Sequence, residues 1–578
     1  MLEATREAWY GRWLSPEAPL YVIAIFICAV IVALTLVVFW ATFVEGLPSI
    51  DAAYTLQNYQ DALLAPSTWS ASFNSLAIGA GTVLVNFFFA IPIAWFVQRT
   101  SLSCKEWYIT LMLVAGVIPG FLKAIAWIFL LSPHNGLINQ WVRQFVDVER
   151  GPFSIYNIAG IAFVQGLMLT PLMFFMVGVA FQKIDNQFEE VGEVSGANAA
   201  RVFRRITAPL VIPAIAAAAI YNFMTAIAIF EIPALLGFPG QIYALSTRIY
   251  QAVNTDLGLP QYGIAGIYGL IMLIPSLVML HFYQKMLRQS HKYSVISGKN
   301  YKAKLIDIGR WAWFGHAFVW LFFSLSFVLP LIVLVWSSLV PYIALPTAKS
   351  FALVNLNAYK VAIDVFTGEP FLNTLKLVLV VSVAVTVFST ILSWVVQRTK
   401  LPGRYAMDTI AMLPHSIPNL AFAFALGFIA LLFARVLPLY GSLAIIMIAH
   451  VVAYISLGTR MVNGALIQIH LDLENAALVC GASPPRVIQK IVLPLLLPSL
   501  AYTAIWVALL SYRETTMAIF LQRPDNVVLS SKIWELWMGT KTSEASAAGV
   551  IMVATLMVLF FVMLKVGNRL GMKGPNLA

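Results

Sequence analysis

The residues of this sequence that could do chemistry are few, and their spacing does not predict a catalytic centre. The 578 residues include seven histidines and three cysteines, and none has the HExxH, HxxxH or CxxC spacing of a metal or redox site. Gly298-Lys299 lacks both the preceding glycine and the following Ser or Thr of a phosphate-binding loop. We therefore expect no enzymatic activity, no ATP hydrolysis, and no metal or other cofactor in this chain.

Charged residues inside apolar segments are the next candidates for function. Glu231 lies late in one apolar segment, and Arg513-Glu514 lies at the matching place of another, 283 positions on. Charges are expensive in lipid and usually face a cavity or a partner. Two interpretations stay open, namely residues of a translocation path or ion pairs that hold helices together. Lys123 and Lys376 lie nearer segment ends, and we expect both to extend to the membrane surface.

The composition predicts that these residues lie in a membrane protein. The chain is 60% hydrophobic and 11% charged, whereas soluble chains carry about 25% charged residues. Segments of about 20 apolar residues can cross a bilayer as helices. Twelve segments qualify, at about 20–43, 73–97, 107–131, 158–181, 210–236, 262–284, 311–338, 372–396, 407–434, 442–464, 495–521 and 546–565.

The distribution of Lys and Arg predicts the orientation. With the N-terminus inside, 23 of the 36 basic residues lie in inside segments and 9 in outside loops. This bias predicts a multi-pass membrane protein with both termini in the cytoplasm. It also accounts for the net charge of +11, so nucleic acid is not an expected partner.

An internal repeat divides the chain. Asn74-Ser-Leu and Asn373-Thr-Leu open corresponding spans, 299 positions apart, and the two spans end in Trp95-Phe-Val-Gln-Arg-Thr100 and Trp394-Val-Val-Gln-Arg-Thr399. Constant spacing between shared polar residues indicates duplication. Six spans per half is an even number, so the halves form a parallel repeat that encloses a path at its interface. The predicted parts are a first half, a basic linker and a second half, at residues 1–290, 291–310 and 311–578.

One cytoplasmic loop in each half has the same glycine–proline spacing. Gly196 is followed 13 residues later by Pro209, and Gly481 is followed 13 residues later by Pro494. We expect a short helix that ends at the glycine, because glycine accepts the left-handed conformation of a helix stop. A second short helix should follow, and the proline should reset the chain before the next span. Apolar side chains such as Phe203 and Ile488 would then be available to fill a partner's groove.

These loops, residues 186–213 and 471–498, resemble the E-A-A-x3-G-x9-I-x-L-P loop of binding-protein-dependent ABC importer permeases. The resemblance implies a type I permease fold in the bacterial inner membrane, two cytoplasmic ATPase subunits that bind ATP and Mg, and an extracytoplasmic solute-binding protein. It implies that the loops dock the ATPases through Glu190, Gly196, Ala197, Arg201, Phe203 and Pro209, and through Asn475, Ala476, Ala477, Gly481, Ala482, Arg486, Ile488 and Pro494. The second copy has Asn475 in place of the motif glutamate, with Glu474 one place earlier, which predicts two unequal couplings.

The fused arrangement resembles the double permeases of ferric-iron importers. Tyr293-Ser-Val-Ile-Ser-Gly-Lys299 is similar to their Y-x-x-V-T-G-K segment, and Phe230-Glu-Ile-Pro-Ala-Leu-Leu236 is similar to a run in their fifth span. Ferric iron is therefore the expected solute, with 2-aminoethylphosphonate, thiamine or a polyamine as alternatives. An ion-coupled secondary transporter is the alternative mechanism, because such proteins also have six-plus-six repeats, but it does not explain the two matched loops.

Overall fold

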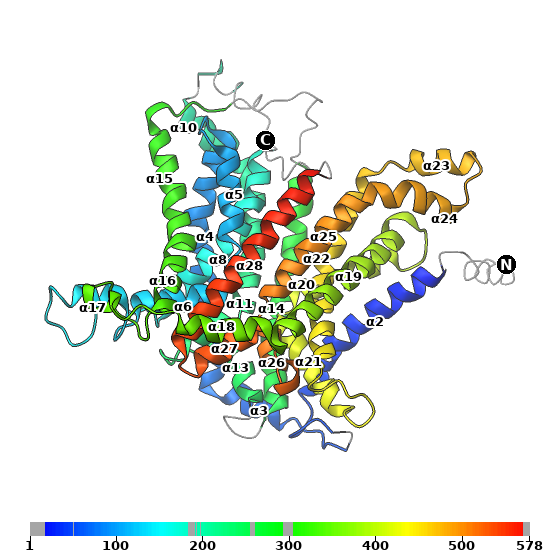
Figure 1. Ribbon diagram of the computed structural model, residues 1–578. Coiled ribbons are helices and arrows are strands. Elements are labelled where there is room, and N and C mark those ends of the chain that lie inside the picture. Colours follow the sequence, from blue (N-terminus) through cyan, green and yellow to red (C-terminus); the bar gives the residue numbers. More distant parts are fainter. Residues whose placement is uncertain are drawn as a thin grey trace. The chain divides into compact units, whose positions relative to one another are not determined.

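The fold is built from helices joined by short loops (Figure 1). The computed structural model describes residues 18–49, 51–182, 191, 194–196, 198–254, 260–292 and 305–569. Within these ranges the extended backbone pairs only at two isolated bridges. The prediction of an all-α membrane protein is confirmed.

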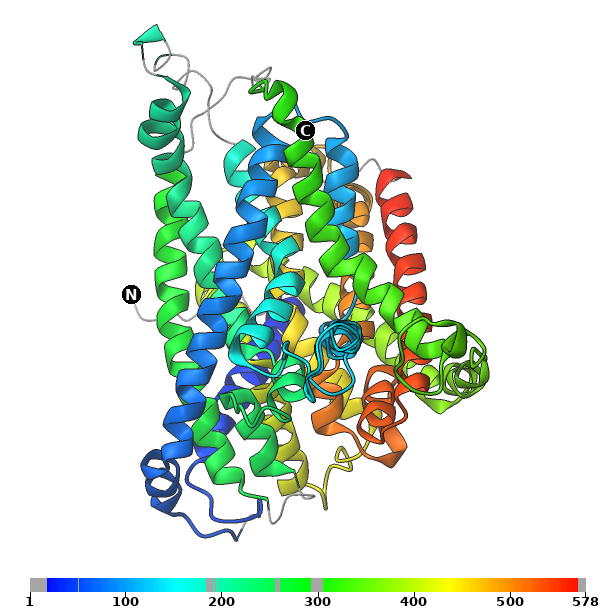
Figure 2. The same cartoon turned by 90° about the vertical axis from the view of Figure 1, so that its left-hand side faces the viewer.

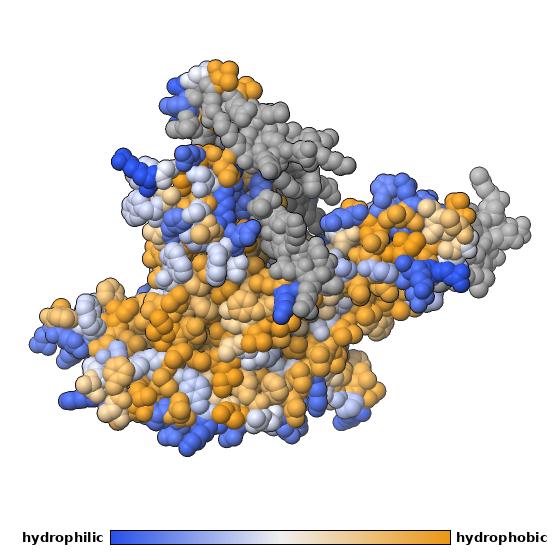
Figure 3. Space-filling model, turned by 45° about the horizontal axis from the view of Figure 1, so that its top comes forward, coloured by the Kyte–Doolittle hydropathy of each residue, from blue (hydrophilic) through white to orange (hydrophobic). Residues whose placement is uncertain are grey.

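The number of membrane-spanning segments agrees with the sequence. Ten described helices are long and apolar enough to cross a bilayer, and two bent helix pairs raise that number to 12. Large apolar side chains on these helices are exposed, for example Phe26, Leu84 and Val383. Figure 3 shows such side chains over wide areas of the visible surface, as expected where lipid is the solvent.

Two compact units contain these helices, and each is described by itself. Unit 1 consists of the described residues within 18–56, 369–530 and 559–569. Its helices are α2 (Ala18–Ala41), α19 (Glu369–Arg398), α20 (Arg404–Ser416), α21 (Asn419–Leu432), α22 (Leu443–Gln468), α23 (Leu471–Val479), α24 (Pro484–Val487), α25 (Leu493–Arg513), α26 (Thr516–Leu521) and the 3₁₀ turn η6 (Pro524–Asn526).

Unit 2 consists of the described residues within 57–368 and 531–558. Its helices are α3 (Gln57–Leu64), α4 (Pro66–Arg99), α5 (Lys105–Ala115), α6 (Gly120–Leu131), α7 (Leu137–Val142), α8 (Ile158–Gln182), α10 (Ala199–Val202), α11 (Ala208–Ala228), α12 (Glu231–Gly237), α13 (Leu245–Val253), α14 (Tyr262–Lys292), the 3₁₀ turn η3 (Gly309–Trp311), α15 (Ala312–Phe323), α16 (Leu329–Leu339), α17 (Ala348–Phe351) and α18 (Asn357–Thr367). The long α4 runs beside α8 (Figure 2). Two further helices, α27 (Leu529–Met538) and α28 (Thr542–Arg569), have residues in both units.

The first span of each half packs with helices of the other half. In unit 1, α2 contacts α19, α20 and α21 of the second half. In unit 2, α15 and α16 contact α4, α5 and α6 of the first half. The sequence repeat does not reveal this exchange, because similar apolar helices could pack equally well onto their own half.

Matched hydrogen bonds show the duplication in three dimensions. The Asn74 side chain donates to the carbonyl of Tyr243 at 3.0 Å, and Asn373 donates to the carbonyl of Val527 at 3.1 Å. The next residues, Ser75 and Thr374, each accept a backbone N–H at 2.8 Å. The repeated polar residues therefore anchor the start of a long span in both halves.

Spans three and nine were predicted as continuous helices, but each consists of two helices, here called arms, joined at a bend. The bend between α5 and α6 is 88°, and that between α20 and α21 is 100°. Each second arm starts directly after a proline, Pro119 or Pro418, whose ψ of 148° or 135° is extended. Proline removes a helical N–H donor and disfavours the helical conformation of the residue before it. The same dipeptide, Ile-Pro, therefore breaks the span in both halves.

The prolines after the two loops do not reset the chain as predicted. Instead, π-helical turns at Phe203–Thr207 and Ile488–Val492 lead directly into α11 and α25. A third π turn, Ser324–Val328, joins α15 to α16. Each turn ends two residues before a proline, which has no N–H and would clash with the carbonyl four residues earlier. A wider turn relieves that clash and keeps the helix continuous.

Candidate functional site

The second of the two matched loops has the predicted helix and the predicted glycine stop. Helix α23 ends in a left-handed residue, Gly481, with φ of +82°. The N–H of Ala482 donates to the carbonyl of Ala477 at 3.0 Å, and the N–H of Gly481 donates to Leu478 at 3.0 Å. This pair of bonds is the Schellman arrangement, which glycine accepts without steric cost. In Figure 1, α23 and α24 lie beyond the ends of α22 and α25.

The first loop has the same stop where the structure describes it. Gly196 has φ of +80°, and the N–H of Ser195 donates to the carbonyl of Val191 at 3.0 Å. Asn198 caps α10, because its side-chain oxygen accepts the N–H of Arg201 at 2.9 Å. Glu190, Ala197 and the side chain of Phe203 lie outside the described residues, as does most of the short helix predicted before Gly196.

One face of α23 packs inward. Ala477, Ala482 and Ile488 pack against a buried cluster made by Trp394, Val462, Leu466, Val487, Val492 and Leu496. Ile488 therefore contacts this chain's own core, which differs from the expectation that it is available to a partner's groove. Glu474 lies on the same inward face as Ala477, one helical turn earlier. Asn475, Ala476 and Arg486 are exposed.

The outward face of α23 carries apolar side chains that the sequence did not predict. Val479 is 88% exposed, and Leu471 and Leu478 are also exposed. In the first loop Val194 is 90% exposed. Val194 and Val479 lie 285 positions apart, and each lies two residues before the loop glycine. This shared offset is the signal that could have identified them.

Glu231 and Glu514 both lie where a span is interrupted. Glu231 is the first residue of α12, directly after the break that ends α11, and Glu514 separates α25 from α26. The carboxylate of Glu231 lies against Gly120, so that a Cβ there would be 2.9 Å from Oε1. Sequence reasoning placed both carboxylates inside continuous spans. Their role in a translocation path stays a prediction.

The side chain of Glu514 is buried and has several polar partners. Its carboxylate accepts the N–H of Met517 at 3.0 Å and that of Ala518 at 3.3 Å. His450 Nε2 lies 3.3 Å from Glu514 Oε2, and His450 Nδ1 bonds Ser511 Oγ at 2.8 Å. The bond to Ser511 joins α22 to α25. Arg513, its neighbour, is the last residue of α25.

Replacing Glu514 with alanine is expected to lower the free energy of unfolding by about 1–3 kcal/mol, because buried N–H groups lose their acceptor. Glutamine at this position keeps one side-chain oxygen and should retain most of that stability. Thermal unfolding of the purified chain in lipid nanodiscs measures both variants. Equal melting temperatures for alanine and wild type would contradict this capping role.

Lys123 does not extend to the membrane surface as predicted. Its side chain is fully buried, and Nζ donates at 2.8 Å to the carbonyl of Ala115 and at 2.8 Å to Ser326 Oγ. Ser326 in turn donates to the carbonyl of Leu167 at 3.1 Å. The lysine thus bridges the two arms of span three and the π turn of span seven. Lys376 is exposed, and its extension to the membrane surface stays a prediction.

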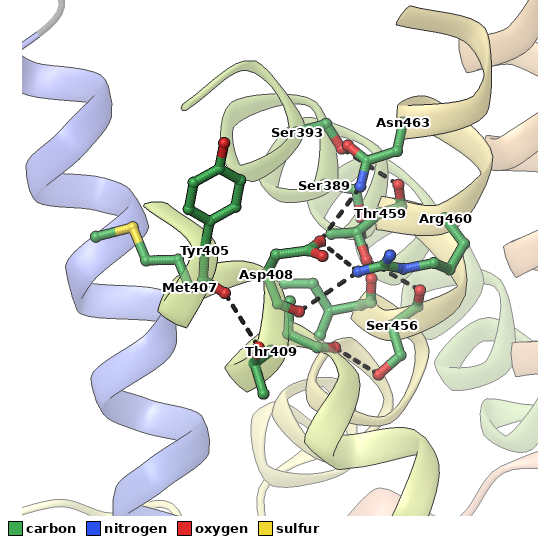
Figure 4. A network of polar contacts seen from close by, with 12 residues as sticks. Ser389, Ser393, Tyr405, Met407, Asp408, Thr409, Ser456, Thr459, Arg460 and Asn463 are labelled. Atoms are coloured by element: carbon green, nitrogen blue, oxygen red, sulfur yellow. Dashed lines mark hydrogen bonds and ion pairs between the residues drawn. The ribbon is translucent and has the colours of Figure 1, made fainter. Parts of the chain in front are cut away.

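A polar network joins α20 and α22 in unit 1 (Figure 4). Arg460 forms an ion pair with Asp408, whose Oδ1 also accepts from Asn463 at 3.4 Å. Ser456 Oγ donates to the carbonyl of Ala411 at 2.7 Å. The first half has Ile109 and Phe175 at the places that match Asp408 and Arg460. The network therefore belongs to the second half alone.

Comparison with known proteins places both halves in one family. The profile described as "Binding-protein-dependent transport system inner membrane component" matches residues 64–292 and 388–569, which is most of the chain. The ferric transport system permease protein FbpB of Actinobacillus pleuropneumoniae is 24% identical over 84% of this chain and 70% of its own length. The putative ferric transport system permease protein FbpB 1 of Haemophilus influenzae is 24% identical over 88% of this chain and 79% of its own. The putative 2-aminoethylphosphonate transport system permease protein PhnV of Salmonella typhimurium is 26% identical over 29% of this chain and 62% of its own.

Proposed function

The chain belongs to the family of binding-protein-dependent transport system inner membrane components, and from this premise we propose that it is the permease of an ATP-driven importer of ferric iron. The observation that carries the proposal is the pair of matched loops, each with a left-handed glycine and an exposed valine two residues before it. The names of the two relatives that cover most of the chain support iron as the solute.

The exposed face of each loop supports a protein partner on the cytoplasmic side. Val194 and Val479 are among the most exposed large apolar residues of the chain. Burying one such side chain in a groove contributes about 1.5 kcal/mol. Because the two loops share this valine and the glycine after it, they favour two copies of one partner. Since the chain has no phosphate-binding loop of its own, that partner is a pair of ABC ATPase subunits.

The proposed mechanism is alternating access. The two ATPases close on ATP, the loops transmit the closure, and the halves open toward the outside. An extracytoplasmic solute-binding protein then releases ferric iron into the path between the halves, and hydrolysis restores the inward-open state. This mechanism requires both loops and both termini to lie in the cytoplasm, which is the orientation that the Lys and Arg distribution predicts.

A native cysteine allows the docking surface to be tested without engineering. Cys480 is exposed beside Val479 and Gly481, whereas Cys104 is exposed outside the loops and Cys28 is buried. We expect bound ATPase to slow maleimide labelling of Cys480 at least tenfold, because docking covers this end of α23. Labelling of Cys104 should change less than twofold, and Val479→Asp should abolish the protection. Unchanged labelling of Cys480 in a complex that co-purifies would contradict the docking surface.

The solute is tested separately from the partner. Proteoliposomes that contain the chain, its ATPase and its solute-binding protein should take up radioactive ferric iron only when ATP is present on the ATPase side. Uptake of 2-aminoethylphosphonate in place of iron would reassign the solute and leave the transporter class unchanged. Uptake driven by an ion gradient without ATP would overturn the importer mechanism itself.

A further inference from the structure

Arg398 contacts three elements at the base of the second loop. It is the last residue of α19, and its side chain is 8% exposed. One terminal nitrogen donates to the carbonyl of Leu466 at 3.0 Å and to that of Ile469 at 2.8 Å. Its Nε lies 2.8 Å from Oε1 of Glu474, which is 13% exposed. The guanidinium therefore joins the end of α19, the end of α22 and the middle of α23.

The chemistry of this contact suits a permanent link. Carbonyls at the end of a helix have no partner within that helix, and a cation there also complements the helix dipole. A planar guanidinium can donate to carbonyls and a carboxylate at once, which a lysine cannot do in the same way. The pair is mostly removed from water, so breaking it would leave a charge without compensation.

We propose that Arg398 is a positioning residue that transmits movement of the second loop to α19 and α22. The inference rests on the proposed function, since it assumes that an ATPase moves α23. The carboxylate of Glu474 is anchored beneath α23, while the apolar side chains of Leu478 and Val479 face outward. A force on the outward face therefore reaches two spans through one charged contact and the buried cluster around Trp394 and Leu466.

The contact also distinguishes Glu474 from the motif position of the second loop. Glu474 faces inward to Arg398, whereas Asn475, at the motif position, is exposed. The first half has the same residue types in the same order, with Arg99 at the end of the repeated Trp-to-Thr segment and Glu189 before Glu190. Arg99 is 1% exposed, whereas residue 189 lies outside the described residues.

The test separates docking from transmission. Arg398→Gln should keep ATP hydrolysis and the ATPase-dependent protection of Cys480 within twofold of wild type, while solute uptake per ATP hydrolysed falls at least tenfold. Arg398→Lys should be intermediate, because it keeps the charge and loses the planar fork. Lys376→Gln removes an exposed charge from the same helix and should change neither quantity.

Each outcome decides the proposal. Uptake per ATP within twofold of wild type in Arg398→Gln overturns it, and so does loss of Cys480 protection, since Arg398 would then serve docking. If Arg398→Gln does not reach the membrane, Glu474→Gln decides, because it leaves the α22 carbonyls bound and should show the same loss of coupling. Absence of Cys480 protection in the unchanged chain would instead overturn the proposed function.

Discussion

Replacing Gly481 with valine is expected to reduce ATP-coupled uptake at least tenfold while the chain still folds and inserts. Gly481 has φ of +82°, and no heavy atom lies within 4 Å of a Cβ built there. The substitution therefore meets no steric obstacle and acts only through the backbone. An L-residue in the left-handed region costs about 1–2 kcal/mol, and a β-branched residue is especially disfavoured there. The chain should relax by changing the angle between α23 and α24, which misplaces the docking face.

The matched control is Gly403→Val. Gly403 has φ of +79°, also with open space around its Cβ, and it precedes α20 in the same unit. Both variants carry the same backbone penalty, but only one lies in the loop. The measurement is uptake into proteoliposomes, normalised to the amount of inserted protein. If both variants transport equally well, the loop conformation does not matter for coupling.

The same substitution in the first loop tests whether the two couplings are equal. Gly196 has φ of +80° and equally open surroundings, so Gly196→Val carries the same local penalty. The loops differ at Glu190 and Asn475, and we expect the two single variants to differ in residual uptake for that reason. Identical residual uptake would contradict unequal coupling.

Replacing Lys123 with leucine is expected to lower the free energy of unfolding by about 2–4 kcal/mol. Leucine fills most of the space but leaves the Ala115 carbonyl and the Ser326 hydroxyl without their donor. An unsatisfied buried polar group costs about 1–3 kcal/mol, and lipid offers no water as a substitute. Relief from burying a charge offsets part of this loss, which is why the expected value lies below the sum for two groups.

Two further variants show whether the cause is the lost donor. The double variant Lys123→Leu with Ser326→Ala should lose further stability, because Ser326 also donates to the Leu167 carbonyl, which has no helical donor since residue 171 is a proline. Lys376→Leu changes an exposed lysine and should have little effect. Thermal unfolding in nanodiscs compares all three variants. A Lys123→Leu variant as stable as Lys376→Leu would show that the buried contacts contribute nothing.

The features that depend on residues close in the chain could be predicted. Apolar length predicted the spans, because a helix in lipid satisfies its own backbone and needs only apolar side chains around it. Repeated polar residues predicted the duplication, which the hydrogen bonds of Asn74 and Asn373 bear out. The position of Gly481 predicted the helix stop, because its left-handed backbone is a local property.

The features that depend on residues distant in the chain could not be predicted from the sequence. The sequence places Lys123 near the end of a span, which predicts a surface lysine. Its hydrogen-bond partners, Ala115 and Ser326, lie 8 and 203 positions away in the chain. The exchange of α2 and α15 between halves depends on side-chain fit between apolar helices, which leaves no pattern in either helix alone. Whether a proline breaks a span, as at Pro119, or is accommodated by a π turn, as at Pro209, depends likewise on the helices packed around it.

The same division holds for the residues proposed to act. The sequence alone determined that there are two loops and where each glycine lies. The predicted match of Glu231 with Glu514 is off by two residues, because α12 begins at Glu231 and α26 begins at Thr516, 285 positions later. Only the tertiary structure decided that Val479 faces outward, that Ile488 faces inward, and that Glu474 pairs with Arg398. The physical reason is that spacing along a helix defines its faces, whereas the surrounding elements decide which face is covered.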